Sequence, residues 1–259
     1  MSILANLFGR PMTRRMQAAI LPRLQWNQEI YGRTISEYLK RGDEWLDVGC
    51  GHRMLAKDLE NLEGELARRA KRVVGCDVDQ SAMLPHMWIT ELHVAPVEKL
   101  PFPDATFDLV TCNMVFEHLA TPAEAFAEMA RVLKPGGKVI LHTPNLWNYM
   151  VFMNHTVGRV LPRSLLMGLI FRSEGREEKD VFPTLYRANT VSRLKELAGK
   201  VGLRAISTRV LTAPQPFFGF FAPLAFLQIL TMRLTMTKTF SRFGQTILMV
   251  FEKGTGATS

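Results

Sequence analysis

Residues 44–53, EWLDVGCGHR, place two glycines one residue apart directly after a short apolar run around Asp47. A run of this kind is typical of a buried strand that leads directly into a turn. Gly49 and Gly51 have no side chains, so backbone N–H groups at this turn can approach a polar ligand closely. The stretch therefore predicts either a tight turn or a nucleotide site, and by itself it does not separate the two.

Short apolar runs alternate with helical patterns from Trp45 onward. This alternation predicts an α/β fold with a doubly wound, mainly parallel sheet and helices on both faces. Residues 55–66 keep a helical period of leucines around Gly64, which allows either one long helix or a loop followed by a shorter helix. Seven strands are expected, five in the segments EWLDVG, RVVGCD, ITELHVA, FDLVTCN and KVILHT, and two more near residues 205–211 and 245–252.

Two later helices have clear start and stop signals. Residues 121–137, TPAEAFAEMARVLKPGG, offer Thr121 as an N-cap and Glu124 in the position of a capping box, and KPGG is expected to end the helix. Residues 189–202, NTVSRLKELAGKVG, repeat this plan and stop at Gly202.

The composition is that of an ordinary globular protein, with 259 residues, 47% of them hydrophobic and 22% charged. Three cysteines form no CxxC pair, so we expect neither a disulfide framework nor a metal site, and a cytoplasmic setting fits best. The apolar start is too short for a signal peptide, so secretion is not expected. Residues 1–41 hold seven Lys or Arg against two Glu, which indicates either an anionic partner or a solvated helix face.

We expect one large domain with additions. Residues 1–40 are predicted to be an N-terminal helical segment, and residues 253–259 a flexible tail. A single α/β domain is expected over residues 41–252, with cap insertions at about 146–187 and 210–240.

The second insertion contains an uncharged run, residues 210–232. This run is long enough to span a bilayer, but several prolines and glycines interrupt it, so a transmembrane helix is disfavoured. Two alternatives remain open: a lid over a substrate pocket, or peripheral membrane contact through residues 210–242, with Arg233, Lys238 and Arg242 at its flank.

Asp77 ends the second predicted strand and is the second sign of a ligand site. Ligands of open parallel sheets gather beyond the carboxyl ends of the strands, where a carboxylate can accept both hydroxyl hydrogens of a ribose. The alternative for Asp77 is a turn-forming residue, and Asp79 is predicted to be a helix N-cap. Because HRML follows the second glycine, the third glycine of a dinucleotide fingerprint is missing, which argues against a nicotinamide cofactor.

As a set, LDVGCG, VVGCDVD, EKLPFPDATFDLVTCNMVFEHL and RVLKPGGKVILHTPN resemble class I S-adenosylmethionine-dependent methyltransferases, and most of all the methyltransferase type 11 family. The resemblance covers about residues 44–145. It implies a Rossmann-like fold, S-adenosyl-L-methionine as cofactor, S-adenosyl-L-homocysteine as product and methyl transfer (EC 2.1.1.-). The leading hypothesis for the acceptor is a small-molecule or lipid-linked compound, and the uncharged run at residues 210–232 motivates the lipid part. An RNA or protein acceptor, and a non-catalytic cofactor-binding protein of the same fold, are the alternatives.

The resemblance also implies roles for individual residues. Asp47 would lie near the amino group of the cofactor, Asp77 would hold the ribose hydroxyls, and Val78 would pack on the adenine. Val97 and Glu98 would edge the adenine. The full set of expected cofactor-binding residues is Asp47, Gly49, Cys50, Gly51, Asp77, Val78, Val97, Glu98, Asn113, Met114 and His118.

A general base would help transfer to a hydroxyl or an amine, and three residues near the carboxyl edge of the sheet are candidates: Glu117, His118 and His142. Other side chains are expected near an acceptor or over the cofactor, but could equally pack the structure: Tyr149, Phe182, Tyr186 and Arg187, and, before the first strand, Asn27, Gln28 and Tyr31.

The sequence departs from the family pattern at two places. Pro96 stands where relatives commonly have an Asp that bonds the adenine, and proline offers neither an acid nor an N–H group. The spacing from Gly51 to Asp77 is longer than usual, so His52 and Arg53 could reach the cofactor carboxylate or be exposed polar residues.

Overall fold

The computed structural model groups the chain into two compact units, which we describe separately. Unit 1 comprises Met1–Asn27, Asn145–Pro183 and Val210–Thr246, and unit 2 comprises Gln28–Pro144, Thr184–Arg209 and Ile247–Ser259. Within them the structure describes residues 10–22, 24–83, 86–149, 151–152, 183–212 and 222–255. Phe182, most of the first expected cap insertion and residues 213–221 of the second lie outside these residues.

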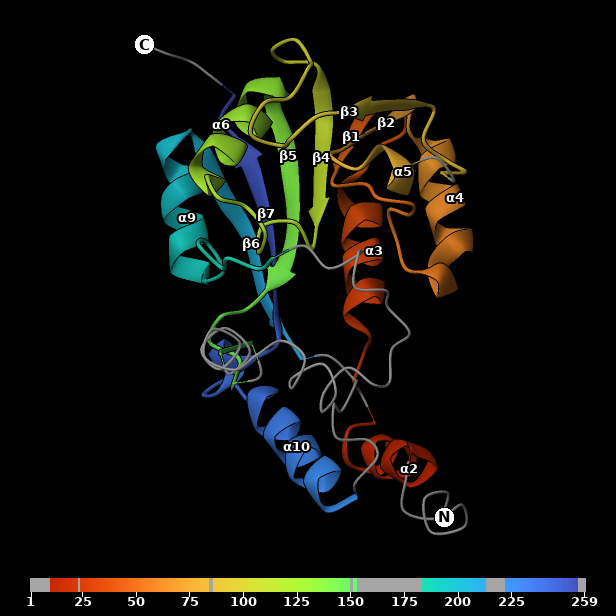
Figure 1. Ribbon diagram of the computed structural model, residues 1–259, viewed down its shortest axis with the longest axis vertical. Coiled ribbons are helices and arrows are strands. Elements are labelled where there is room, and N and C mark those ends of the chain that lie inside the picture. The colour runs from red at the N-terminus through yellow and green to blue at the C-terminus, as the bar shows by residue number, and fades with distance from the viewer. Residues whose placement is uncertain are drawn as a thin grey trace. The chain divides into compact units, whose positions relative to one another are not determined.

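A seven-stranded sheet in the order β3-β2-β1-β4-β5-β7-β6 is the frame of unit 2 (Figure 1). The predicted α/β fold with seven strands is confirmed. The strands are β1 (Glu44–Val48), β2 (Arg72–Asp77), β3 (Glu91–Val94), β4 (Phe107–Asn113), β5 (Leu133–Pro144), β6 (Leu203–Leu211) and β7 (Thr246–Lys253).

The sheet is mixed although most of its pairings are parallel. β1 pairs in parallel with β2 and β4, β2 with β3, and β4 with β5. β7 runs opposite to β5, since Lys253 at its end donates from Nζ to the carbonyl of Leu133 at the start of β5, 2.6 Å away (Figure 1). β1 and β4 are adjacent although β2 and β3 lie between them in sequence, so their carboxyl ends form the switch point where ligands of such sheets bind.

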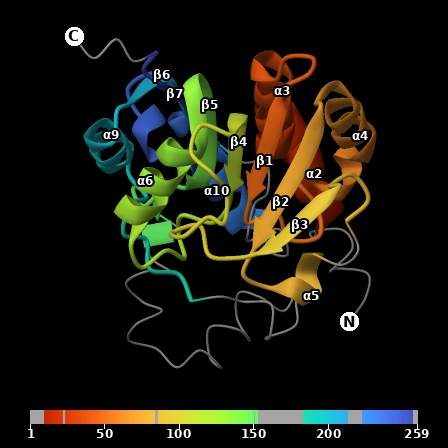
Figure 2. The same cartoon turned by 90° about the horizontal axis from the view of Figure 1, so that it is seen from above.

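Helices cover both faces of this sheet, as Figure 2 shows, with α3 and α4 on one face and α6 and α9 on the other. The helical elements are α2 (Arg10–Ile20), α3 (Asn27–Tyr38), η1 (Lys57–Leu59), α4 (Glu60–Arg69), α5 (Gln80–Met83), α6 (Pro122–Val132), α9 (Val191–Lys200), α10 (Ala222–Thr235) and η3 (Ser241–Phe243). The doubly wound arrangement follows from strands that are apolar on both faces and therefore need cover on each.

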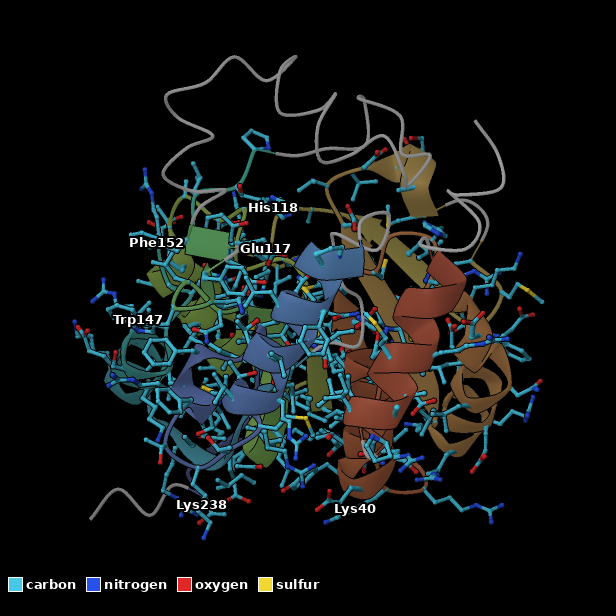
Figure 3. All side chains as sticks on the ribbon, turned by 90° about the horizontal axis from the view of Figure 1, so that it is seen from below. Lys40, Glu117, His118, Trp147, Phe152 and Lys238 are labelled. Atoms are coloured by element: carbon cyan, nitrogen blue, oxygen red, sulfur yellow. The ribbon has the colours of Figure 1, made fainter. Side chains whose placement is uncertain are left out.

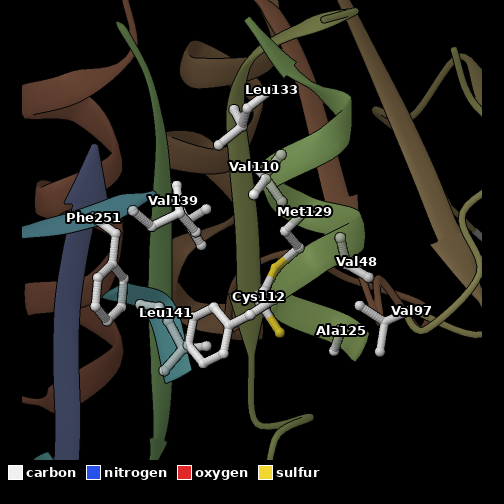
Figure 4. Close-up of a cluster of buried hydrophobic side chains, with 14 of the residues drawn as sticks. Val48, Val97, Val110, Cys112, Ala125, Met129, Leu133, Val139, Leu141 and Phe251 are labelled. Atoms are coloured by element: carbon white, nitrogen blue, oxygen red, sulfur yellow. The ribbon is translucent and has the colours of Figure 1, made fainter. Parts of the chain in front are cut away.

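The core between α6 and the sheet is shown in Figure 4. Val110 and Cys112 of β4 pack with Val139 of β5 and with Met129 of α6, and all four side chains are buried. Val97 belongs to the same cluster, which anchors the loop after β3 to the sheet.

Local signals placed most helix ends correctly, with two differences at α6. Of the two alternatives for residues 55–66, the structure has the loop, which includes a 3-10 turn, followed by the shorter helix. Gly64 lies inside that helix, where a Cβ would be 2.7 Å from the Trp88 ring. The predicted capping box at Thr121 is wrong, because its hydroxyl donates to the Glu124 carboxylate, 3.0 Å away, and caps no backbone N–H. Helix α6 already ends at Val132, and KPGG belongs to β5.

None of the helices in the described ranges is long and apolar enough to cross a membrane. Within the expected insertion at 210–240, α10 occupies Ala222–Thr235, and residues 213–221 are outside the description.

Candidate functional site

The turn after β1 needs its two glycines for different reasons. Both have positive φ, 69° at Gly49 and 48° at Gly51. A Cβ on Gly49 would lie 2.2 Å from Cγ2 of Val115, so the loop after β4 packs directly on the bare backbone. A Cβ on Gly51 would meet no atom of the described residues within 4 Å, so as far as these residues go the space above this second glycine is open. That space is where a ligand can approach the turn.

Asp77 holds the turn by its carboxylate. Oδ2 accepts the backbone N–H of Gly51 at 2.9 Å, and Oδ1 accepts that of Asp79, also at 2.9 Å. Each oxygen keeps a second lone pair, and the side chain is half-buried, so the carboxylate can still accept two hydroxyl groups. Asp79 caps α5 as predicted, with Oδ1 accepting the N–H of Ser81 at 2.9 Å. The residues present thus fit a ribose diol at Asp77.

The side chains expected around an adenine differ in their exposure. Val78 is 56% exposed, which is unusual for an apolar residue beside a buried strand and leaves it available to a flat ring. Val97 is only 5% exposed and packs in the core, so its backbone rather than its side chain would border a ligand there. Glu98 beside it is half-buried. The carbonyl of Pro96 accepts the N–H of Lys99 at 3.0 Å.

Asp47 is a buried acid on the α3 face of β1. The hydroxyl of Thr111 donates to Oδ1 of Asp47, and Nε1 of Trp45 donates to that hydroxyl at 2.7 Å. Burial raises the pKa of Asp47 to about 8, and the charges of Glu63 and Asp77 add to this effect. The hydrogen bond from Thr111 acts in the opposite direction and lowers the pKa. A cationic group next to this carboxylate would offset the cost of burying its charge.

A second cluster, partly buried, links α3 to the ends of β4 and β5. Nδ1 of His142 lies 2.9 Å from Oδ1 of Asn113, and Nδ2 of Asn113 donates to Oε1 of Gln28 at 3.2 Å. The ring of His142 stacks on that of Tyr31, with 5.5 Å between centroids. Burial lowers the pKa of His142 to about 4, so the ring is neutral at physiological pH. The tautomer with its proton on Nδ1 can donate to Oδ1 of Asn113.

Glu117 and His118 lie next to each other in the loop after β4 (Figure 3). Glu117 is 5% exposed, and its Oε2 accepts the hydroxyl of Thr143 at 3.1 Å; that hydroxyl in turn accepts Nδ2 of Asn189 at 2.7 Å. Oε1 of Glu117 is 3.9 Å from Nε2 of His118, which is half-exposed. Burial raises the pKa of Glu117 to about 7. A group with this pKa can gain or lose a proton near neutrality.

Comparison with known proteins gives the family of the segment that forms this site. The family model described as "Methyltransferase domain" matches residues 46–141. Residues 46–141 belong to that family. They hold the end of β1, all of β2, β3 and β4, the turn after β1 and the loop with Glu117, so Asp47, Asp77 and Glu117 lie within the methyltransferase domain. The clusters described above also include side chains from outside the matched residues: Gln28, Tyr31, His142, Thr143 and Asn189.

The methyltransferase domain is also the part shared with curated relatives. The chain is 31% identical over 125 residues to a demethylmenaquinone methyltransferase of Symbiobacterium thermophilum, which covers 45% of this chain and 47% of that protein. It is 39% identical over 112 residues to a ubiquinone biosynthesis O-methyltransferase of Alkalilimnicola ehrlichii, covering 40% and 42%. The chain thus spans less than half the length of either relative.

The fold extends beyond the methyltransferase domain. An S-adenosylmethionine-dependent methyltransferase of Mesorhizobium loti superposes with a TM-score of 0.52 at 16% identity, covering 86% of this chain and 95% of that one. At this identity the likeness shows the Rossmann-like methyltransferase fold alone.

The remaining candidate residues have the following surroundings. Arg53 pairs with Glu60 at 3.3 Å, and His52 is exposed. Cys50 is buried, and Met114 has a φ of 56°. Further residues lie elsewhere: Tyr186 is buried, Arg187 donates to the carbonyl of Ala120 at 2.7 Å, and Tyr149 and Asn27 belong to unit 1.

Sequence patterns gave no signal for Thr111, Trp45, Thr143 and Asn189, because their roles depend on neighbours that are distant in the chain. Among the residues that the structure describes, no group of three or more His, Cys, Asp or Glu could hold a metal ion.

Glu117→Gln is expected to remove part of the pH dependence of stability in the methyltransferase domain. The pKa of Glu117 is raised from 4.5 to about 7, so its favourable contribution is complete below pH 4.5 and is lost as the pH rises through 7. Between those values the wild type should lose about 3 kcal/mol of unfolding free energy relative to the variant. Urea unfolding of both proteins at several pH values measures this, and parallel pH profiles would contradict it.

Proposed function

We propose that the protein is an S-adenosylmethionine-dependent methyltransferase that acts on a small-molecule or lipid-linked acceptor. The observation that carries this proposal is the carboxylate of Asp77. It accepts the N–H of Gly51, above which the described residues leave open space, and it can still accept the hydroxyl groups of a ribose. Val78, exposed beside it, offers an apolar surface to the base. The match of residues 46–141 to the methyltransferase family and the absence of a third glycine support this cofactor over a dinucleotide.

The names of the two relatives support a small apolar acceptor. One is named for demethylmenaquinone and the other for ubiquinone biosynthesis, and both names refer to quinones. A lipid-linked acceptor of that kind would be met at a bilayer surface, which agrees with the expected peripheral membrane contact through residues 210–242.

The cofactor supplies an electrophilic methyl group on a sulfonium, so the protein has to orient the reactants more than it has to activate them. Asp77 would hold the ribose hydroxyls, and the bare backbone at Gly51 would let the turn approach the ligand. The buried Asp47 would face the amino group of the cofactor, because its pKa of about 8 shows that burial of its charge is unfavourable without a cation.

Glu117 and His118 are the best-placed groups to receive a proton from an acceptor. His118 is the more exposed of the two, and a positive charge on its ring would be stabilised by the Glu117 carboxylate 3.9 Å away. His142 is less suitable, because burial lowers its pKa to about 4 and its ring packs against Tyr31.

Isothermal titration with S-adenosylmethionine, S-adenosylhomocysteine and NAD tests the proposed cofactor. We expect saturable binding of the first two and none of NAD. Binding of NAD alone, or of none of the three, would overturn the proposal. Transfer of a labelled methyl group to a quinol or phenol, compared with RNA and with a protein mixture, then separates the proposed acceptor class from the alternatives. Cofactor binding without transfer to any of them would favour the non-catalytic alternative.

A further inference from the structure

The two units differ sharply in charge. Unit 1 contains twelve Lys or Arg and four Asp or Glu, whereas unit 2 contains twenty of each kind. The net charge of +8 therefore belongs entirely to unit 1. In the part of unit 1 that the structure describes, there is no Asp or Glu, so the exposed cations Arg15, Arg233 and Lys238 have no acidic neighbour among these residues. A separation of this kind marks a surface for an anionic partner.

Helix α10 supplies an apolar face to the same unit. Its inner side, with Ala225, Ile229 and Met232, is buried, and Ile229 and Met232 pack with Leu21 after α2. Its outer side is exposed over three turns and includes Leu227, which is 58% exposed. We call the following residues the basic apolar surface: Phe226, Leu227, Leu230, Arg233, Leu234 and Lys238.

Aromatic side chains add to the apolar exposure of unit 1. Trp147 is 59% exposed, and Figure 3 shows it with Phe152 on the segment that follows β5, with Lys238 also exposed. This segment is anchored to the turn after α10, since Nδ2 of Asn145 donates to the carbonyl of Arg242 at 2.8 Å and Nδ2 of Asn148 to that of Phe243 at 3.1 Å. Tryptophan rings of this kind prefer the headgroup level of a bilayer.

We infer that unit 1 docks on the surface of an anionic phospholipid bilayer through its basic apolar surface. Exposed leucine and phenylalanine side chains enter the boundary between headgroups and acyl chains, while Arg and Lys bind the lipid phosphates. A second copy of the chain fits less well, because two strongly positive units would repel each other. Nucleic acid would satisfy the cations but would leave the row of exposed leucines uncovered.

This inference goes beyond methyl transfer, because lipid binding by unit 1 requires neither cofactor nor acceptor. The helices of the described ranges do not cross a bilayer, so the contact would be interfacial. Its failure and the failure of the proposed function are therefore separable: the first is measured with vesicles and no cofactor, and the second by cofactor titration with no vesicles.

Vesicle sedimentation tests the inference with the full chain. Vesicles of phosphatidylcholine alone are compared with vesicles that also contain phosphatidylglycerol, and we expect about tenfold or stronger binding to the second kind, with a marked loss in high salt. Equal binding to both kinds, or no binding to either, would overturn the inference. Dimerisation in light scattering with no lipid binding would instead assign the surface to a second copy.

Matched variants locate the contact. The double variant Leu227→Glu with Leu230→Glu is expected to weaken binding by about tenfold or more, because two exposed apolar side chains that would enter the bilayer become charged. Lys238→Glu should weaken it about fivefold. The controls carry the same charge changes in unit 2: the double variant Met87→Glu with Val94→Glu, at two exposed apolar side chains, and Lys195→Glu on α9.

The controls are expected to bind lipid as the wild type does, within experimental error. If Lys195→Glu weakens binding as much as Lys238→Glu, the net charge of the whole chain is responsible and the proposed surface is wrong. Thermal melting of each variant checks that it folds. If the double variant does not fold, two comparisons still test whether unit 1 binds anionic lipid: the one between the two vesicle types, and the one between Lys238→Glu and Lys195→Glu.

Discussion

Asp77→Ala is expected to weaken binding of S-adenosylmethionine by about 100-fold, the largest binding effect of any single substitution we consider. The carboxylate would accept two ribose hydroxyls, and hydrogen bonds to charged groups contribute about 1.5–3 kcal/mol each. The substitution also removes the acceptor of the Gly51 N–H, so the turn that faces the ligand loses its anchor. Isothermal titration of the wild type and the variant measures the change.

Asp79→Ala is the matched control, two residues further along the chain. Its carboxylate caps α5 by accepting the N–H of Ser81, so the substitution should lower stability without changing cofactor affinity. Asp77→Asn should give an intermediate affinity, because the amide keeps one acceptor oxygen. Equal loss of affinity in Asp77→Ala and Asp79→Ala would show that the local fold, and not the carboxylate of Asp77, determines binding.

Gly49→Ala is expected to lower the free energy of unfolding by about 3 kcal/mol or more. Two costs combine at this position: a φ of 69°, which side chains rarely adopt, and a Cβ placed 2.2 Å from Cγ2 of Val115. Gly51→Ala has the first cost without the second, and should lose only about 1 kcal/mol. Urea unfolding of the two variants measures the difference.

The second-site variant Gly49→Ala with Val115→Ala tests the cause. Removing the two methyl groups of Val115 relieves the overlap, so the double variant should be more stable than expected from the sum of the single changes. Gly51→Ala is expected to show the opposite profile, a small loss of stability with a clear loss of cofactor affinity, because its Cβ would project into the open space. Equal destabilisation by both alanines would contradict the role assigned to Val115.

Local sequence signals were sufficient for much of the frame. The alternation of apolar runs predicted the strands, because parallel strands buried on both faces need continuous apolar side chains. Asp79 and Thr190 cap their helices within two or three residues, so their hydrogen bonds follow from the local order of residues. The predicted capping box at Thr121 is wrong, because local order does not fix the rotation of a hydroxyl group. The Thr121 hydroxyl donates to the Glu124 carboxylate and does not accept a backbone N–H.

The sequence by itself thus determined the glycine turn, the acid at the end of β2 and the family of residues 46–141. Only the tertiary structure decided that the hydroxyl of Thr111 meets Asp47, 64 residues away, and that Asn113 bonds Gln28 across 85 residues. It also gathered three separate segments into unit 1, where all of the net charge lies. The physical reason is that strand register and side-chain packing, which no local pattern encodes, select which distant residues become neighbours.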